Sequence, residues 1–391
     1  MKVHPRATSA LLAALIPLAS VLVPVAARAA EPSVFERNAA REFPSVFQAW
    51  SPAQIAGEDP LATLARHDLV FCSARLMGLD WNNPQQGLAT GFLAEGLPAA
   101  HAKRQALLQR NPRMIFLCEI RYRDASRSFL PDDSTWWKRL PDGNRAPGWA
   151  EGKFFKLDFA NAEYRAQIAL QSKAAVKSGV FDGIMLDWWE ETRDTADRIA
   201  LLQEIRAAIG RDALIIVNNN DRPLPLSAPF IDGLFLECSE TQTPARWRKI
   251  ADTLRWARGA LHDGRFACLE FWYHQSRQDL NLMRAAATLS LTLSDGYCLF
   301  SDPNPLPTPD HLHDWYPFWN KSLGRPLAPG RDRPDGAIER RFEHGVAVHN
   351  PMGNAAVTVS FTTDHRSLAT GTTTRTHSIA PADGDIFIEG K

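Results

Sequence analysis

The chain has 391 residues, with 44 basic and 44 acidic side chains and a formal net charge of zero at pH 7. Its lysines and arginines form no run. The basic stripe that nucleic acid requires is therefore missing, and no nucleic-acid partner is expected.

The first thirty residues, MKVHPRATSALLAALIPLASVLVPVAARAA, have the three parts of a secretory signal peptide. A positively charged start precedes an apolar run at 11–25 and an Ala-Arg-Ala site at 27–29. Two prolines interrupt the apolar run, which is also shorter than the ~20 residues of a membrane span. We therefore expect residues 1–29 to be removed after Ala29. The mature chain would be periplasmic or secreted and would have no membrane span.

The cysteines and the motif inventory argue against a metal or cofactor site. An odd number of cysteines excludes a fully paired disulfide framework, and a free cysteine behaves as a small buried hydrophobe. The sequence contains no CxxC, HExxH, GxSxG or P-loop motif, so we predict no metal, no cofactor and no serine nucleophile elbow. The five cysteines are Cys72, Cys118, Cys238, Cys268 and Cys298.

Eight strand-like runs alternate with helical patterns between Pro44 and Pro303. Their continuous apolar character is typical of parallel strands buried on both faces. The helical stretches include 162–178 and 195–210, the second closed by Gly210. This order predicts a (β/α)8 barrel, whereas an open doubly wound sheet would need a glycine-rich phosphate turn. The predicted strands are 45–50, 69–74, 114–120, 183–189, 214–220, 233–239, 266–273 and 296–302.

The pattern changes from about Asp335 to short alternating segments separated by Gly, Pro and Asn. Such alternation predicts antiparallel strands. A mature chain of about 360 residues also suits a large domain followed by a small one. We predict a barrel at 30–325, a linker rich in proline and glycine at 326–336, and a small C-terminal β-sandwich at 337–391.

Polar and aromatic side chains gather where the predicted strands end. In a barrel the catalytic groups sit at the carboxyl ends of the strands, on the face built by the βα loops. By contrast, Asp182 and Asp232 each precede a glycine at the start of a strand, and we predict turn residues there, on the opposite face. The residues at the strand ends are Trp50, Arg75, Glu119, Arg121, Asp187, Trp188, Trp189, Asn218, Asn219, Asn220, Glu237, Glu270, Trp272 and Asp302.

These residue types suit glycoside hydrolysis. That reaction requires two carboxyl groups flanking the scissile bond. Aromatic faces, abundant in a chain with twelve tryptophans, stack on sugar rings, although burial in the core is the alternative for each. Asp187 follows an apolar run and precedes two tryptophans, so we expect a catalytic role for it. Glu119 stands beside Arg121 and is equally compatible with a structural ion pair.

The segment KLDFANAEYRAQIALQSKAAVKSGVFDGIMLDWWEE (156–191) resembles a recurrent segment of bacterial glycoside hydrolases that have a (β/α)8 barrel. It is similar, more distantly, to the clan of α-galactosidases and α-glucosidases and to endo-α-1,4-galactosaminidase-like barrels. In those groups the acids end strands four and six, which implies Asp187 and Glu237 here. Families with acids on strands four and seven leave Glu270 as the alternative partner.

The resulting hypothesis is an exported, metal-independent glycoside hydrolase acting on a poly- or oligosaccharide. Asp187 would be the ionised member of the pair, as the nucleophile or its electrostatic equivalent, with the amides of 218–220 nearby. Glu237 would be the general acid, because desolvation raises a carboxyl pKa. The substrate-binding residues would be Trp50, Arg75, Glu119, Arg121, Trp188, Trp189, Asn218, Asn220, Trp272 and Asp302. The rival hypothesis is a non-catalytic carbohydrate-binding barrel. The sugar, its linkage and the oligomeric state stay open.

Overall fold

The computed structural model describes residues 1, 31–50, 55, 57–239, 243–262, 266–272, 277–301 and 311–390, apart from the side chains of Ser239 and Trp272. From Ser33 onward the chain forms one compact unit. The signal peptide expected at 1–29 lies outside the described residues except for Met1, and its cleavage stays a prediction. Within the described ranges, every helix is too short or too polar to cross a bilayer.

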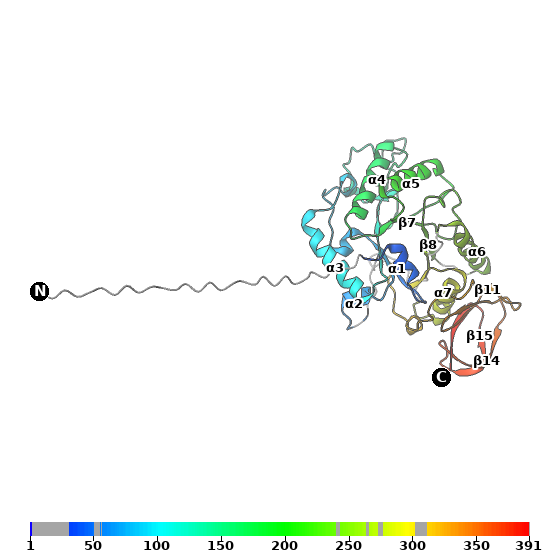
Figure 1. Ribbon diagram of the computed structural model, residues 1–391. Helices are drawn as coiled ribbons and strands as arrows, with labels where there is room; N and C mark the ends of the chain where they lie inside the picture. Colours follow the sequence, from blue (N-terminus) through cyan, green and yellow to red (C-terminus); the bar gives the residue numbers. More distant parts are fainter. Residues whose placement is uncertain are drawn as a thin grey trace. The chain divides into compact units, whose positions relative to one another are not determined.

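Eight parallel strands form the central sheet, in the order β1-β2-β3-β6-β7-β8-β9-β10. A bridge between Val46 and Cys298 and a 2.9 Å hydrogen bond from Cys298 N–H to Ser45 O join the last strand to the first. The sheet therefore closes, and the predicted (β/α)8 barrel is confirmed (Figure 1). The strands are β1 (Phe47–Ala49), β2 (Leu69–Cys72), β3 (Ile115–Glu119), β6 (Gly183–Leu186), β7 (Leu214–Asn218), β8 (Gly233–Ser239), β9 (Phe266–Trp272) and β10 (Tyr297–Ser301).

Helices follow most of the strands. Gly210, with φ 77°, ends α5 as predicted, because a left-handed residue at this position suits glycine. Between β7 and β8, residues 219–232 contain only turns, so the fifth unit of the barrel has no helix. The α-helices are α1 (Val34–Ala39), α2 (Pro60–Leu64), α3 (Leu97–Arg110), α4 (Ala162–Lys177), α5 (Thr195–Ile209), α6 (Pro244–Ala260) and α7 (Leu280–Leu293). Short 3₁₀ turns lie at η1 (Ala74–Met77), η2 (Gln86–Leu88), η3 (Ala94–Gly96), η4 (Arg127–Phe129) and η5 (Pro317–Trp319).

Asp182, at the start of the fourth barrel strand, is a buried anchor. Its carboxylate pairs with Arg37 at 2.5 Å and with Arg104 of α3 at 2.8 Å. It also accepts the backbone N–H of Phe116 at 2.9 Å. The adjacent Gly183 has no room for a side chain, because a Cβ would lie 2.2 Å from the carbonyl oxygen of Leu214. The Asp-Gly pair therefore ties two helices to the sheet where neighbouring strands approach closely.

The same device recurs at the sixth barrel strand. Asp232 pairs with Arg206 of α5 at 2.6 Å and accepts the backbone N–H of Ile215 at 2.8 Å. A Cβ on Gly233 would lie 2.5 Å from the carbonyl oxygen of Phe266. Both aspartates stand at strand starts, as predicted, and each binds a helix to the sheet as well as forming a turn.

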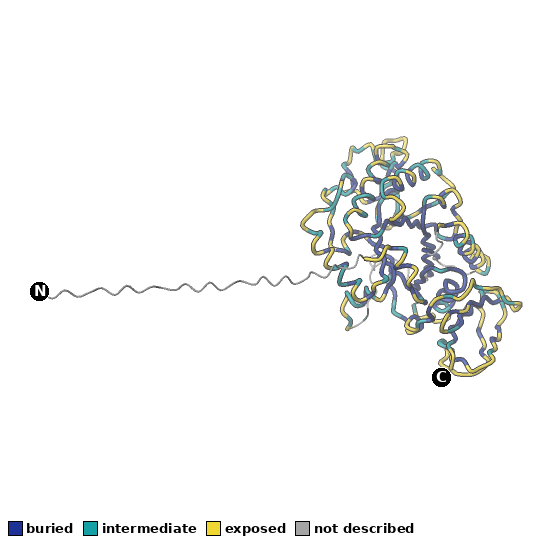
Figure 2. Tube along the Cα trace, viewed as in Figure 1, coloured by how far each residue is buried: buried dark blue, intermediate teal, exposed yellow. Residues whose placement is uncertain are grey.

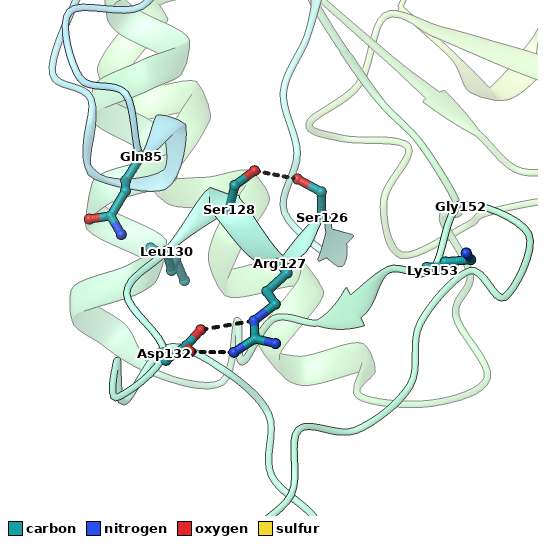
Figure 3. A pocket seen from close by; sticks show the side chains of 8 residues that line it. All are labelled: Gln85, Ser126, Arg127, Ser128, Leu130, Asp132, Gly152 and Lys153. Carbon is teal, nitrogen blue, oxygen red and sulfur yellow. Dashed lines mark hydrogen bonds and ion pairs between the residues drawn. The ribbon is translucent and has the colours of Figure 1, made fainter.

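A long excursion between β3 and α4 holds the two-stranded antiparallel sheet of β4 (Asp124–Ala125) and β5 (Phe155–Lys156). It also carries an open cavity of about 630 Å³. In this cavity Arg127 pairs with Asp132 at 2.6 Å (Figure 3). The lining residues are Gln85, Ser126, Arg127, Ser128, Leu130, Asp132, Gly152 and Lys153. Because none of these is a strand-end acid, the cavity is separate from the chemistry considered below.

Aromatic side chains fill the interior of the barrel beneath its mouth. The rings of Phe71 and Phe235 lie 4.9 Å apart, and Phe47 lies 5.7 Å from Phe71 and 5.8 Å from Phe235. Since β8 is not a neighbour of β1 or β2 in the sheet, these contacts cross the interior. Figure 2 shows the barrel strands buried along their length. All five cysteines are free and buried, which confirms the prediction that they act as core residues.

The C-terminal segment forms an antiparallel sheet, as predicted, with six strands in the order β11-β12-β13-β16-β14-β15. Ala347 and Ile386 belong to the main core, whereas Val348 and Phe387 belong to a second, smaller one. Figure 1 shows the sheet beside α7. β11 falls within the predicted linker 326–336 and pairs with β12. The strands are β11 (Arg331–Asp332), β12 (Ile338–Phe342), β13 (Gly345–Asn350), β14 (Val357–Ser367), β15 (Thr373–Ile379) and β16 (Asp383–Glu389).

Candidate active site

The carboxyl groups of Asp187 and Glu237 meet at one amide nitrogen. Asn218, the last residue of β7, donates from Nδ2 to Asp187 Oδ1 at 2.8 Å and to Glu237 Oε2 at 2.7 Å. Both hydrogens of the amide are thereby used. Because both bonds start at the same nitrogen, the two accepting oxygens lie no more than about 5.5 Å apart. The paired carboxyls of retaining glycosidases are about 5–5.5 Å apart, whereas those of inverting enzymes are about 6.5 Å or more apart. Asn218 thus bridges the two acids, and the prediction that it also binds substrate stays a prediction.

The environment separates the two acids electrostatically. Burial, reinforced by the nearby charge of Glu119, raises the pKa of Asp187 to about 6, against the opposing effects of Arg121 and of the Asn218 hydrogen bond. The pKa of Glu237 is raised to about 8, mainly by burial and also by the charges of Asp187 and Glu270, against the opposing effects of His311 and of the Asn218 hydrogen bond. Of two interacting carboxyls, the one with the lower pKa ionises first. Between these values Asp187 is charged and Glu237 holds a proton.

Glu119 ends β3 as a nearly buried acid next to the same site. Its Oε1 lies 3.0 Å from Nε of Arg121, and Arg121 also stacks over the ring of Phe154 at 4.9 Å. Asp124 is paired with Arg123 at 2.8 Å. Glu119 and Arg121 therefore form an ion pair whose two members shift the pKa of Asp187 in opposite directions.

The sequence analysis missed His311, which lies beyond the last barrel strand. Its Nδ1 lies 2.9 and 2.8 Å from the two carboxylate oxygens of Glu270 and therefore donates to them. Its Nε2 lies 3.8 Å from Glu237 Oε1. Glu270 is fully buried and also accepts from Ser301 Oγ at 2.5 Å. Glu270, the predicted alternative acid, is therefore hydrogen-bonded to His311 beside Glu237.

The same three side chains are the place where a metal ion could sit. Glu237, Glu270 and His311 present ligand atoms that lie within 4.8 Å of one another. Glu270 and His311 already satisfy each other through short hydrogen bonds. Two of the three candidate ligand groups are thus hydrogen-bonded to each other, and the absence of a metal ion stays a prediction.

Trp50 forms the floor of the site. It stacks on His311 with ring centroids 4.8 Å apart and meets the rings of Phe71 and Phe235 edge-on at 5.1 and 6.0 Å. Within the described ranges its buried Nε1–H has no hydrogen-bond partner, and a buried donor of this kind calls for one. Trp50 is placed to shield the acids from water and to offer a donor to a bound molecule.

The two tryptophans after β6 face opposite environments. Trp188 is 44% exposed, has a positive φ of 57° and lies under the guanidinium of Arg123 at 4.5 Å. Trp189 is 1% exposed, and its indole N–H donates to Ser227 Oγ at 2.9 Å. The prediction that Trp189 binds substrate is therefore wrong, because the left-handed turn at Trp188 directs the following residue into the core. Trp188 stays a candidate platform.

The remaining predicted residues divide into three groups. Arg75 is 84% exposed and pairs with Asp80 at 3.0 Å. Asn219 is buried and donates to Arg222 O, while the backbone N–H of Asn220 donates to Asn218 Oδ1 at 3.1 Å and helps to orient that amide. Asn220 thus supports the site through its backbone. The side chain of Trp272 and all of Asp302 lie outside the described residues.

Comparisons with known proteins support the fold. No protein-family model and no curated sequence matches the chain. Among solved structures it is similar to a cyclomaltodextrinase, with a TM-score of 0.54 and 10% identity over 91% of this chain and 79% of that one. It is also similar to a maltogenic α-amylase from Thermotoga neapolitana (TM-score 0.52, 11% identity, 90% and 97% covered) and to an α-amylase from Malbranchea cinnamomea (0.52, 11%, 92% and 98%).

At these identities the likeness shows the architecture, a barrel followed by a C-terminal β domain, and not the activity. The resemblance of 156–191 to the α-galactosidase clan and to galactosaminidase-like barrels stays a prediction.

The two neighbouring tryptophans give a matched pair for mutation. Trp189→Ala empties a buried site and should cost about 3–5 kcal/mol of stability. Trp188→Ala removes an exposed ring and should cost at most about 1 kcal/mol, but should weaken oligosaccharide binding at least tenfold. Thermal melting and isothermal titration calorimetry measure the two effects. A large loss of melting temperature with unchanged binding for Trp188→Ala would place that ring in the core.

Proposed function

We propose that this protein is an exported glycoside hydrolase that retains the configuration of the sugar it cleaves, with Asp187 as nucleophile and Glu237 as general acid and base. The observation that carries the proposal is the single amide of Asn218 shared by two carboxyls with unequal pKa values. A glycosidase requires one ionised and one protonated carboxyl at this separation. The structural neighbours, named as α-amylases and a cyclomaltodextrinase, have the same barrel architecture.

In the first step an oxygen of Asp187 attacks the anomeric carbon. Oδ1 already accepts from Asn218 and from the Trp188 backbone N–H, which leaves Oδ2 to form the new bond. As the bond from the anomeric carbon to the leaving oxygen breaks, that oxygen takes the proton of Glu237. The proton stands on Oε1, because Oε2 accepts from Asn218. The products are a glycosyl ester of Asp187 and a carboxylate at Glu237.

In the second step water replaces Asp187 on the anomeric carbon. Once esterified, Asp187 has no charge, so its contribution to raising the pKa of Glu237 disappears. Glu237 can then take a proton from the attacking water while the bond between the anomeric carbon and Asp187 breaks. Two displacements at one carbon give net retention.

The rings at the mouth suit a carbohydrate ligand. Trp188 offers an exposed face held by Arg123. Trp50 stacks on His311, and its buried indole N–H has no partner among the described residues. The alternative function, a carbohydrate-binding barrel without turnover, shares these features. It gives no reason for two carboxyls to be held together in a desolvated site, where each raises the cost of ionising the other. The enzyme is therefore the better explanation.

Removal of either carboxyl should abolish turnover without unfolding the barrel. Purified protein is incubated with a panel of α- and β-linked oligosaccharides, beginning with α-glucans, and new reducing ends are measured. Asp187→Asn and Glu237→Gln should lower kcat by about a thousandfold or more with little change in melting temperature. The matched control is Asp232→Asn, which breaks a buried ion pair at the other end of a strand and should lower stability instead.

Binding across the panel without any release of reducing ends would favour the carbohydrate-binding barrel. If Glu237→Gln stays active while Glu270→Gln is inactive, the acid is on the seventh strand.

The product should carry the same anomeric configuration as the substrate. Both carboxyls accept from one amide nitrogen, and a pair held this close leaves no room for a water molecule between the nucleophilic carboxylate and the sugar. Proton NMR of the anomeric region, recorded in the first minutes before mutarotation, identifies the first product formed. An inverted first product would show that Asp187 activates water and does not form a glycosyl ester.

The pH dependence of kcat/KM should be bell-shaped. Activity should fall below about pH 6, where Asp187 becomes protonated, and above about pH 8, where Glu237 loses its proton. These limits belong to the interacting pair. Initial rates measured in assays between pH 4 and pH 10 determine these two limits. A plateau that extends well above pH 9 would be incompatible with Glu237 as the proton donor.

A further inference from the structure

We propose that His311, fixed by Glu270, is a positioning residue that provides the positive charge facing Glu237 and stabilises its carboxylate form between the two chemical steps. This inference rests on the proposed function. It concerns a histidine and a buried acid that the two-carboxyl mechanism does not itself use.

His311 is held rigidly. Its backbone φ of 56° is unfavourable for a residue with a side chain, and such strain persists where the surroundings determine the conformation. The ring is 3% exposed, is stacked on Trp50 and has the edge of Phe235 6.1 Å away. The backbone carbonyl of His311 accepts from Nδ1 of His313 at 3.1 Å. The orientation of the imidazole is therefore built in.

Glu270 determines which nitrogen points at Glu237. Its two carboxylate oxygens accept from Nδ1, so Nε2 is the nitrogen directed at Glu237 Oε1, 3.8 Å away. Glu237 and Glu270 are register neighbours on adjacent parallel strands, which places them at the same height in the barrel. A buried carboxylate bonded to an imidazole favours the doubly protonated, cationic ring. The cationic ring of His311 then lies between the carboxyl groups of Glu270 and Glu237.

The charged and polar groups that face Glu237 come from four elements. Asp187 follows β6 and Glu270 lies on β9, and both repel its carboxylate; Asn218 of β7 donates to it. His311 is the group whose charge favours ionisation of Glu237. Glu119 and Arg121 shift the pKa of the neighbouring Asp187, in opposite directions. When Glu237 gives its proton to the leaving oxygen, the new negative charge therefore appears opposite the imidazolium.

The prediction concerns His311→Gln, with Glu270→Gln as a second variant that keeps the ring and weakens its charge. The substrate is a dinitrophenyl glycoside of the sugar that the panel identifies. Its leaving group departs without a proton, so only the second step requires Glu237 as a base. His311→Gln should lower kcat at least tenfold and lower KM in parallel, leaving kcat/KM within about threefold, because the glycosyl ester accumulates.

A readout independent of turnover is the titration of Glu237 itself. Carbon-13 NMR of side-chain carboxyls identifies the Glu237 signal by its loss in Glu237→Gln. In His311→Gln this titration should move upward by at least about one pH unit. Glu270→Gln should move it by less, because that change removes a carboxylate that raises the pKa of Glu237 as well as the hydrogen-bond partner of the imidazole. The control is His344→Gln, a change at an exposed position of the C-terminal sheet, which should leave the titration in place. Circular dichroism and thermal melting confirm folding of each variant.

An unchanged Glu237 titration in folded His311→Gln would overturn the inference, as would equal losses in kcat and kcat/KM for that variant. If the panel shows no hydrolysis, the proposed function fails, and the NMR titration still decides whether His311 sets the charge of Glu237. A change in the Glu237 titration of the wild-type protein after treatment with EDTA would also overturn the inference. It would show that a bound ion links Glu237, Glu270 and His311.

Discussion

Repulsion among carboxylates is the constraint around which the barrel mouth is arranged. Parallel strands bring their carboxyl ends to one rim, and four acids lie in or directly after these strands: Glu119, Asp187, Glu237 and Glu270. Close to apolar walls such charges repel each other strongly. Each acid accordingly has its own compensating contact: a guanidinium for Glu119, a shared amide for the central pair, and an imidazole for Glu270.

The aromatic floor makes these electrostatic contacts effective. Phe47, Phe71 and Phe235 fill the interior across non-neighbouring strands, and Trp50 covers them. A dry wall below the acids raises the cost of ionisation, so the positions of neutral and charged neighbours decide which carboxyl keeps its proton. The ring contacts that stabilise the barrel therefore also set the dielectric environment of Asp187 and Glu237.

The sequence predicted the parts that depend on local pattern. Continuous apolar runs located all eight barrel strands, and the position after each run located Asp187, Asn218 and Glu237. The errors arose where the backbone turns. A positive φ at Trp188 sends Trp189 inward, which spacing along a strand cannot reveal. His311 was missed because it reaches the site from beyond the last strand. The HLH sequence at 311–313 gave no periodic signal, and its role depends on a contact with Glu270 forty-one residues earlier.

The strands β6 and β8 each have an aspartate before their first residue and an acid at or near their carboxyl end. A comparison of the contacts at the two ends shows why a neutral amide suits the centre of the site. At the strand start Asp232 binds Arg206 directly, and this pairing gives a fixed ionic link between helix and sheet. At the strand end Asp187 and Glu237 receive hydrogen bonds from Asn218, which orients both oxygens without adding a charge. An arginine there would favour two carboxylates and leave no proton to donate, whereas an apolar residue would let the acids separate. An uncharged donor with two hydrogens keeps the pair close and still allows one member to change its protonation state.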